Sequence, residues 1–96
     1  MRLTNTACKN AQPKERAYKL ADGGGLYLEV MPNGSRYWRL KYRFVGKEKR
    51  LALGVYPEVT LAEAREKRDA ARKLLSQDID PGQAKQERKR QAAINA

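Results

Sequence analysis

The sequence contains no histidine and a single cysteine, Cys8. Because histidine is the commonest general base near neutral pH, its absence removes the usual route to acid–base catalysis. One thiol cannot form an intramolecular disulfide, and one soft ligand cannot hold a structural zinc ion. We expect Cys8 to be a small buried residue, as free cysteines commonly are. We expect no metal or other cofactor, and no enzymatic activity in this chain by itself.

Long hydrophobic runs are also absent, and no segment approaches the roughly 18 apolar residues of a transmembrane helix. The opening stretch, MRLTNTACKNAQPKE, contains no apolar signal-peptide core. These two absences lead us to expect a cytoplasmic protein with no membrane partner. Hydrophobic residues make up 41% of the sequence but many of them are alanine, so the 96 residues should form one domain with a small core.

Positive charge is what the sequence has in excess. Its 21 lysines and arginines against 11 aspartates and glutamates leave a formal net charge of +10. Such an excess repels itself in a compact fold, and it is typical of proteins that bind a polyanion. Nucleic acid is the first candidate, and an anionic membrane surface is a distant second.

One stretch of the sequence, RYWRLKYRF from Arg36 to Phe44, has a clear two-residue period. Side chains of a β-strand alternate between its two faces, so this stretch predicts a strand with one buried face. The apolar face carries Trp38, Leu40, Tyr42 and Phe44. The opposite face carries Tyr37, Arg39, Lys41 and Arg43.

Turn signals around this strand predict a three-stranded antiparallel meander. The Asn33-Gly34 pair is a strong hairpin signal and joins the strand to a preceding one at residues 26–30. The chain turns again at Gly46-Lys47 into a third strand at about residues 48–53. The segment at residues 14–25 is expected to be a connecting loop.

The main predicted helix begins at a capping box, because Thr60 is followed three residues later by Glu63. It should cover residues 61–77, with leucines and alanines on one stripe at helical period. That stripe should cover the apolar face of the sheet. The predicted fold class is therefore α+β, with a two-layer arrangement of a three-stranded antiparallel sheet packed against one main helix.

Two shorter helical segments flank this unit. A short helix is expected at residues 3–11, capped by Thr4 or Asn5. The Asp-Pro-Gly sequence at residues 80–82 should end the main helix and turn the chain. The residues after it favour helix but have no apolar stripe, so they are interpreted as the start of a C-terminal linker helix.

Between Arg36 and Arg50 the sequence places seven cations and one anion, Glu48. A solvated strand face also carries lysines, but it ordinarily mixes both signs. Cations that face each other across strands repel, so Arg50 beside Lys41 or Arg43 needs a compensating ligand. Arginine pairs bidentately with phosphate and guanine, and a β-ribbon fits the major groove of B-form DNA. We therefore predict a duplex DNA site that consists of Tyr37, Arg39, Lys41, Arg43, Lys47, Lys49 and Arg50.

Within this site the strand cations are expected to meet base edges and flanking phosphates, while Lys47 and Lys49, near the turn, should contact backbone phosphate. Two alternatives remain open, a small RNA- or ribosome-associated basic module and a protein-interaction domain that docks an acidic partner. The deep, narrow major groove of duplex RNA excludes a sheet, and single-strand readers usually stack bases on exposed aromatic residues. Most aromatic residues here lie on the apolar face, so DNA is favoured.

Several short motifs, taken together, resemble the N-terminal arm-type DNA-binding domain of prophage tyrosine integrases. They are Asp22-Gly-Gly-Gly-Leu26, Gly34-Ser-Arg-Tyr-Trp38, Leu53-Gly-Val-Tyr-Pro57, Leu61-Ala-Glu-Ala-Arg65 and Asp80-Pro81. With LTNTACKNAQP before them, the likeness covers about residues 3–83. The resemblance implies binding to arm-type sites that flank a recombination core, with the sheet in the major groove.

The resemblance also implies a domain organisation. Residues 1–82 would form the arm-type DNA-binding domain, and residues 83–96 would begin a linker helix toward a core-binding domain. The full-length parent would then be a tyrosine recombinase, whose partners include attachment-region DNA, other integrase protomers and DNA-bending accessory proteins. The catalytic residues of that family include histidines, which this sequence lacks.

Overall fold

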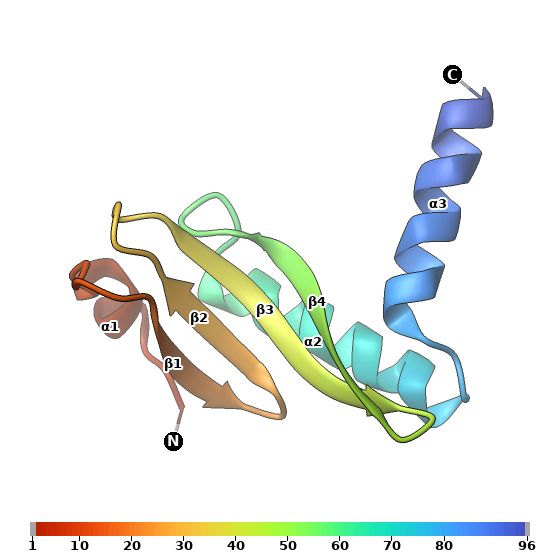
Figure 1. Cartoon of the computed structure of the whole chain (residues 1–96), viewed down its shortest axis with the longest axis horizontal. Coiled ribbons are helices and arrows are strands. Elements are labelled where there is room, and N and C mark those ends of the chain that lie inside the picture. Colours follow the sequence, from red (N-terminus) through yellow and green to blue (C-terminus); the bar gives the residue numbers. More distant parts are fainter. Residues whose placement is uncertain (1, 96) are drawn as a thin grey trace.

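The computed structural model describes residues 2–95, and side chains are described for residues 2–90. Its antiparallel strands form one sheet in the order β1-β2-β3-β4, with bounds Tyr18–Gly23, Leu26–Val30, Arg36–Phe44 and Lys47–Val55. Figure 1 shows the three helices, which are α1 (Asn5–Asn10) beside β1, α2 (Leu61–Ser76) across one face of the sheet, and α3 (Pro81–Asn95), which projects away. Within residues 2–95 no helix combines the length and apolar character needed to cross a membrane.

The prediction of three strands is wrong, because residues 18–23 form a fourth strand, β1, that pairs antiparallel with β2. Tyr18 and Leu20 pack against the core, while Lys19 between them is exposed. A bulge at Asp22 breaks this alternation, and glycines follow it directly. The strand is therefore short and its pattern is hidden by turn-like residues. The α+β class is confirmed.

Two tight turns fix how β3 pairs with its neighbours. The predicted hairpin turn at residues 32–35 joins β2 to β3. Between β3 and β4, Val45 and Gly46 have φ values of 52° and 74°, as in a two-residue hairpin turn. In the resulting register Lys41 lies opposite Arg50. Because side chains alternate along each strand, this register decides which of them share a face.

The core lies between the sheet and α2. Trp38 of β3 is fully buried, and its indole Nε1–H donates a hydrogen bond to the Val59 carbonyl at 2.7 Å. Ala64 and Ala71 are the small buried residues that let α2 approach the sheet closely. The other apolar side chains of the core include Leu26, Leu28, Val30, Leu40, Leu51, Leu53 and Leu61. Cys8 is buried with them, as expected.

The predicted capping box begins α2. Thr60 Oγ1 accepts the Glu63 N–H at 3.2 Å, and the Glu63 carboxylate accepts the Thr60 N–H at 3.4 Å. The helix ends at Ser76, one residue before the predicted end. Helix α1 is shorter than predicted, and Thr4 caps it by accepting the Ala7 N–H at 3.0 Å.

Helix α3 begins beside an aspartate that also ties it to the sheet. Asp80 accepts the Gly82 N–H at 2.9 Å, and Pro81 occupies the first helical position, where a missing N–H costs nothing. The buried Asp80 carboxylate also accepts the Tyr42 hydroxyl at 2.6 Å and the Lys49 ammonium at 2.5 Å. The Asp-Pro-Gly sequence thus separates two helices, and the second begins at residue 81 rather than 83.

Acid should weaken the link between α3 and the sheet. Burial alone would raise the pKa of Asp80, but hydrogen bonds from Lys49, Tyr42 and Gly82 outweigh it and lower the pKa to about 2. A carboxyl group whose pKa is lower in the folded state than in the unfolded state stabilises the fold at a pH above its ordinary pKa. This stabilisation is lost as the pH falls toward the pKa of the folded state. We expect protonation of Asp80 to lower the free energy of unfolding by roughly 2 kcal/mol as the pH falls from about 5 to about 2.

Urea denaturation of the wild type and of Asp80→Asn across that pH range measures this contribution. The variant should be the less stable protein at pH 5, and the two should converge toward pH 2. Parallel pH profiles for the two proteins would contradict the role assigned to Asp80.

Candidate nucleic-acid interface

The face of the sheet that points away from α2, which we call the outer face, carries a group of exposed charged side chains. Residues paired across antiparallel strands share a face, so the register assigns its members. They are Lys19, Ala21, Tyr27, Glu29, Tyr37, Arg39, Lys41, Arg43, Glu48, Arg50, Ala52 and Val55. The alternation predicted for β3 is therefore confirmed, with Trp38, Leu40, Tyr42 and Phe44 toward α2 and with Arg39, Lys41 and Arg43 on the outer face.

Two of the outer-face cations are paired with carboxylates. Arg39 Nε donates to Glu29 Oε1 at 2.8 Å, and the guanidinium carbon lies 5.6 Å from the centroid of the Tyr37 ring. Lys41 Nζ lies 2.7 Å from Glu48 Oε1, and both of these side chains are about half exposed. An exposed ion pair contributes about 0–1 kcal/mol, so an incoming phosphate can replace the Lys41–Glu48 pair at little cost. The Arg39–Glu29 pair is less accessible, with side chains 29% and 15% exposed.

Arg43 and Arg50 are exposed, and neither forms an ion pair with any side chain described in residues 2–90. Arg43 lies opposite Glu48, but that carboxylate is held by Lys41. Arg50 lies directly opposite Lys41, and two cations in this position repel. The like-charge contact expected from the sequence is therefore present, and it favours binding of an anion.

Glu48 lies among several cations and stays ionised. The hydrogen bond from Lys41 lowers the pKa of Glu48, and the charges of Lys41, Arg43 and Lys19 lower it further. Counting the residues assigned by the register, the outer face has five cations and two carboxylates. It keeps a net positive charge after its internal ion pairs are formed.

Lys47 and Lys49 do not lie on the outer face. Lys47 pairs with Phe44 and Lys49 with Tyr42, so both extend from the side of the sheet that carries α2. Lys47 is exposed next to the hairpin turn. Lys49 is bound to the buried Asp80, where its charge stabilises the start of α3. Lys49 therefore lies off the outer face, and its expected contact with backbone phosphate stays a prediction.

Lys19 belongs to the outer face, although the sequence interpretation missed it. It lies opposite Glu29, and its Nζ is 5.0 Å from the centroid of the Tyr27 ring. Tyr27 is buried although it belongs to the outer face, and the Lys19 ammonium lies over its ring. The Tyr27 hydroxyl has no hydrogen-bond partner among the described residues. The alternation of Tyr18, Lys19 and Leu20 was the signal that could have identified this residue.

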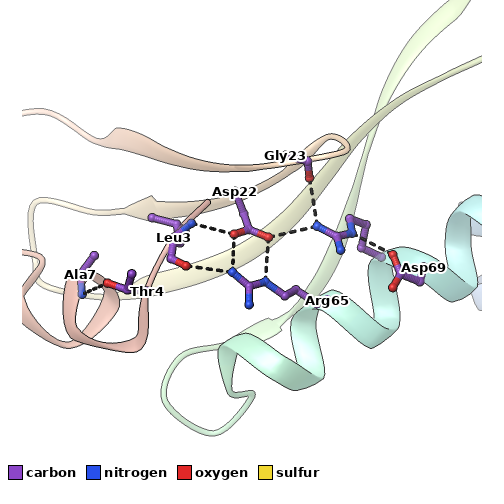
Figure 2. A network of polar contacts seen from close by, with 8 residues as sticks. Leu3, Thr4, Ala7, Asp22, Gly23, Arg65 and Asp69 are labelled. Atoms are coloured by element: carbon purple, nitrogen blue, oxygen red, sulfur yellow. Dashed lines mark hydrogen bonds and ion pairs between the residues drawn. The ribbon is translucent and has the colours of Figure 1, made fainter. Parts of the chain in front are cut away.

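A second group of arginines is committed to the fold. Figure 2 shows Asp22 facing Arg65 of α2, whose Nε and Nη2 donate to its carboxylate at 3.0 and 2.8 Å. The same carboxylate accepts Arg68 Nη1 at 3.0 Å and the Leu3 N–H at 2.7 Å. Arg36 likewise donates to a carbonyl of α1 at 2.8 Å. These cations join the helices to the sheet and are not available for a ligand.

No group of three or more histidine, cysteine, aspartate or glutamate side chains in the described part of the chain could hold a metal ion. The fold instead presents a four-stranded sheet whose exposed face is cationic. A basic face of this kind on a small α+β domain is typical of the nucleic-acid-binding class. The family model described as the Arm DNA-binding domain matches residues 3–88, and the chain belongs to this family. The resemblance seen in the sequence is confirmed.

Curated relatives of the chain are integrases. The integrase of Enterobacteria phage P4 is 60% identical over 83 residues, which are 84% of this chain and 19% of that protein. The integrase of Shigella phage Sf6 is 51% identical over 83 residues, 86% of this chain and 22% of that protein. The prophage integrase IntZ of Escherichia coli (strain K12) is 42% identical over 95 residues, 97% of this chain and 24% of that protein. The chain thus spans about a fifth of the length of these relatives.

Proposed function

We propose that this domain binds duplex DNA by inserting the outer face of its sheet into the major groove. The observation that carries the proposal is the exposed pair Arg43 and Arg50, which have no ion pair among the described side chains and lie beside Lys41. A β-ribbon has the width and alternation to place such side chains at base edges. Membership in the Arm DNA-binding domain family supports DNA as the ligand.

The residues of the outer face divide into two roles. Arg43 and Arg50 are free to form bidentate hydrogen bonds with guanine, the commonest base-specific contact of arginine. Lys41, whose pair with Glu48 is about half exposed, and Lys19, which is exposed opposite Glu29, suit contacts to phosphate. Arg39, which Glu29 holds in a less exposed pair, would approach the DNA from the same face. Tyr37 offers a phosphate hydrogen bond or an apolar contact, and Lys47 next to the turn can reach the backbone.

The parent protein is proposed to be a site-specific tyrosine recombinase that recognises arm-type attachment sites with this domain. The integrases that match the chain are about four times as long as this chain, which leaves room for a core-binding and a catalytic domain after residues 1–82. In this proposal α3, which projects away from the sheet in Figure 1, starts the linker to them. Other integrase protomers and DNA-bending proteins would be partners of the whole assembly.

Salt dependence of binding tests this function. If the domain makes about five phosphate contacts, log K should fall against log salt concentration with a slope of about −4 to −5. Fluorescence anisotropy with a labelled attachment-region duplex measures the slope, and unlabelled duplex RNA of the same sequence serves as competitor. RNA should compete poorly, because its deep major groove does not admit a sheet. A slope near zero, or equal competition by RNA, would refute the proposal.

Arg43→Ala should cost about 1–3 kcal/mol of binding free energy on the attachment-region duplex if Arg43 reads a base. The loss should be smaller on a duplex of random sequence, because a lost base contact reduces only specific binding. Anisotropy titrations of both duplexes measure the difference, with Lys9→Ala as a control that removes a cation from α1. Equal losses on the two duplexes would assign Arg43 to phosphate.

A further inference from the structure

A groove runs between the outer edge of β4 and the first turns of α3, and it has a volume of about 710 Å³. β4 is an edge strand of the sheet, so its outer side lacks a neighbouring strand. Lys85 of α3 donates to the Ala52 carbonyl on this edge at 2.8 Å, which holds the helix beside the strand. Side chains that line the groove include Lys49, Arg50, Asp80, Lys85 and Lys89.

The accessible charge in this groove is positive. Its carboxylate, Asp80, is buried and already binds Lys49 and Tyr42. Lys85 and Lys89 form no ion pair with any side chain described in residues 2–90.

A third lysine, Lys67, lies close to Lys85. Lys67 of α2 lines a smaller adjoining hollow together with Lys85 and Arg88. Burial lowers the pKa of Lys85, and the nearby charges of Lys89 and Lys67 lower it further. Three cations held close together by two helices and a strand edge repel one another, so an anion between them would be bound favourably.

We propose that this groove binds the sugar-phosphate backbone of the duplex whose major groove receives the outer face. The inference deepens the proposed function and rests on it. Arg50 connects the two surfaces, since it belongs to the outer face by register and also lines the groove. One strand of the DNA would therefore follow the β4 edge and pass between Arg50 and the lysines of α3. The groove contributes phosphate contacts and no base reading.

A lysine-to-glutamine pair tests the groove. Lys85→Gln/Lys89→Gln in the 96-residue chain should reduce affinity for duplex DNA roughly tenfold or more at about 0.1 M salt, and should flatten the salt slope by about 2. The loss should be equal on attachment-region and random duplexes. Lys85→Arg/Lys89→Arg should retain wild-type affinity and slope, because arginine keeps the charge.

The matched control, Lys9→Gln/Lys14→Gln, removes the same charge from α1 and the segment after it, at the other end of the molecule (Figure 1). It should leave the salt slope within about 0.5 of the wild-type value, since a distant cation makes no phosphate contact. If the control pair and the groove pair have equal effects, only net charge matters and the inference fails. It also fails if the groove pair binds as wild type while Arg43→Ala still weakens binding, an outcome that leaves the proposed function intact. Failure of the wild type itself to bind duplex DNA would refute the proposed function.

Discussion

Replacing Arg43 by glutamine and Arg50 by glutamate in one variant should reduce affinity for duplex DNA by roughly 100-fold or more at about 0.1 M salt. Each lost phosphate or base-edge contact costs nearly tenfold under these conditions, and the new carboxylate repels the duplex. Glutamine is chosen at position 43 because a glutamate there would face Glu48. Glutamate at position 50 faces Lys41, so it removes a repulsion from the folded domain.

The control for this variant is Lys9→Gln/Lys14→Glu, which changes the net charge by the same amount in α1 and in the segment between α1 and β1. It should lose no more than about threefold in affinity, since exposed distant charges are screened beyond about 10 Å. Circular dichroism should show both variants folded, because surface substitutions of this kind change stability by about 0.5 kcal/mol. Equal losses of affinity in the two variants would show that the outer face is not the binding surface.

Asp22→Asn should destabilise the fold by roughly 3 kcal/mol, the usual cost of removing one partner from a buried ion pair. Asp22 is 3% exposed and accepts hydrogen bonds from Arg65, Arg68 and the Leu3 N–H. An asparagine cannot balance two guanidinium groups, and its amide places donors where only acceptors fit. Three parts of the fold meet at this carboxylate: the segment that precedes α1, the strand β1 and the helix α2. The loss of stability should therefore appear as a lower midpoint in cooperative urea unfolding.

Asp69→Asn is the matched control for Asp22→Asn. Asp69 also accepts from Arg68, at 3.0 Å, but its side chain is 69% exposed. An exposed pair of this kind contributes about 0–1 kcal/mol, so the control should unfold at nearly the wild-type urea concentration. Equal destabilisation by the two variants would contradict the structural role of the Asp22 network.

The two-residue period of β3 was enough to predict which of its side chains share the outer face. Alternation places side chains on opposite faces whatever the neighbouring strands are, so Arg39, Lys41 and Arg43 were correctly assigned to one face. The same rule applied to β4 would have placed Lys49 with Leu51, on the core side. Its partner Asp80 follows 31 residues later, and that contact depends on where α3 begins.

The fourth strand was missed for a different physical reason. Asp22 followed by glycines has the composition of a turn, and an aspartate in a strand is ordinarily unfavourable. It is tolerated because Arg65 and Arg68, from a helix 43 and 46 residues later, neutralise it in the bulge. Local patterns contain no information about such a partner. Missing β1 also meant missing Lys19 on the outer face.

Chemical-shift mapping of the isotope-labelled chain during titration with an attachment-region duplex tests most directly whether the outer face binds DNA. The largest amide and side-chain changes should fall on β3 and β4, with Arg39, Arg43 and Arg50 among them, and α1 should change little. Large changes on the solvent side of α2, with β3 and β4 unaffected, would contradict the proposed interface.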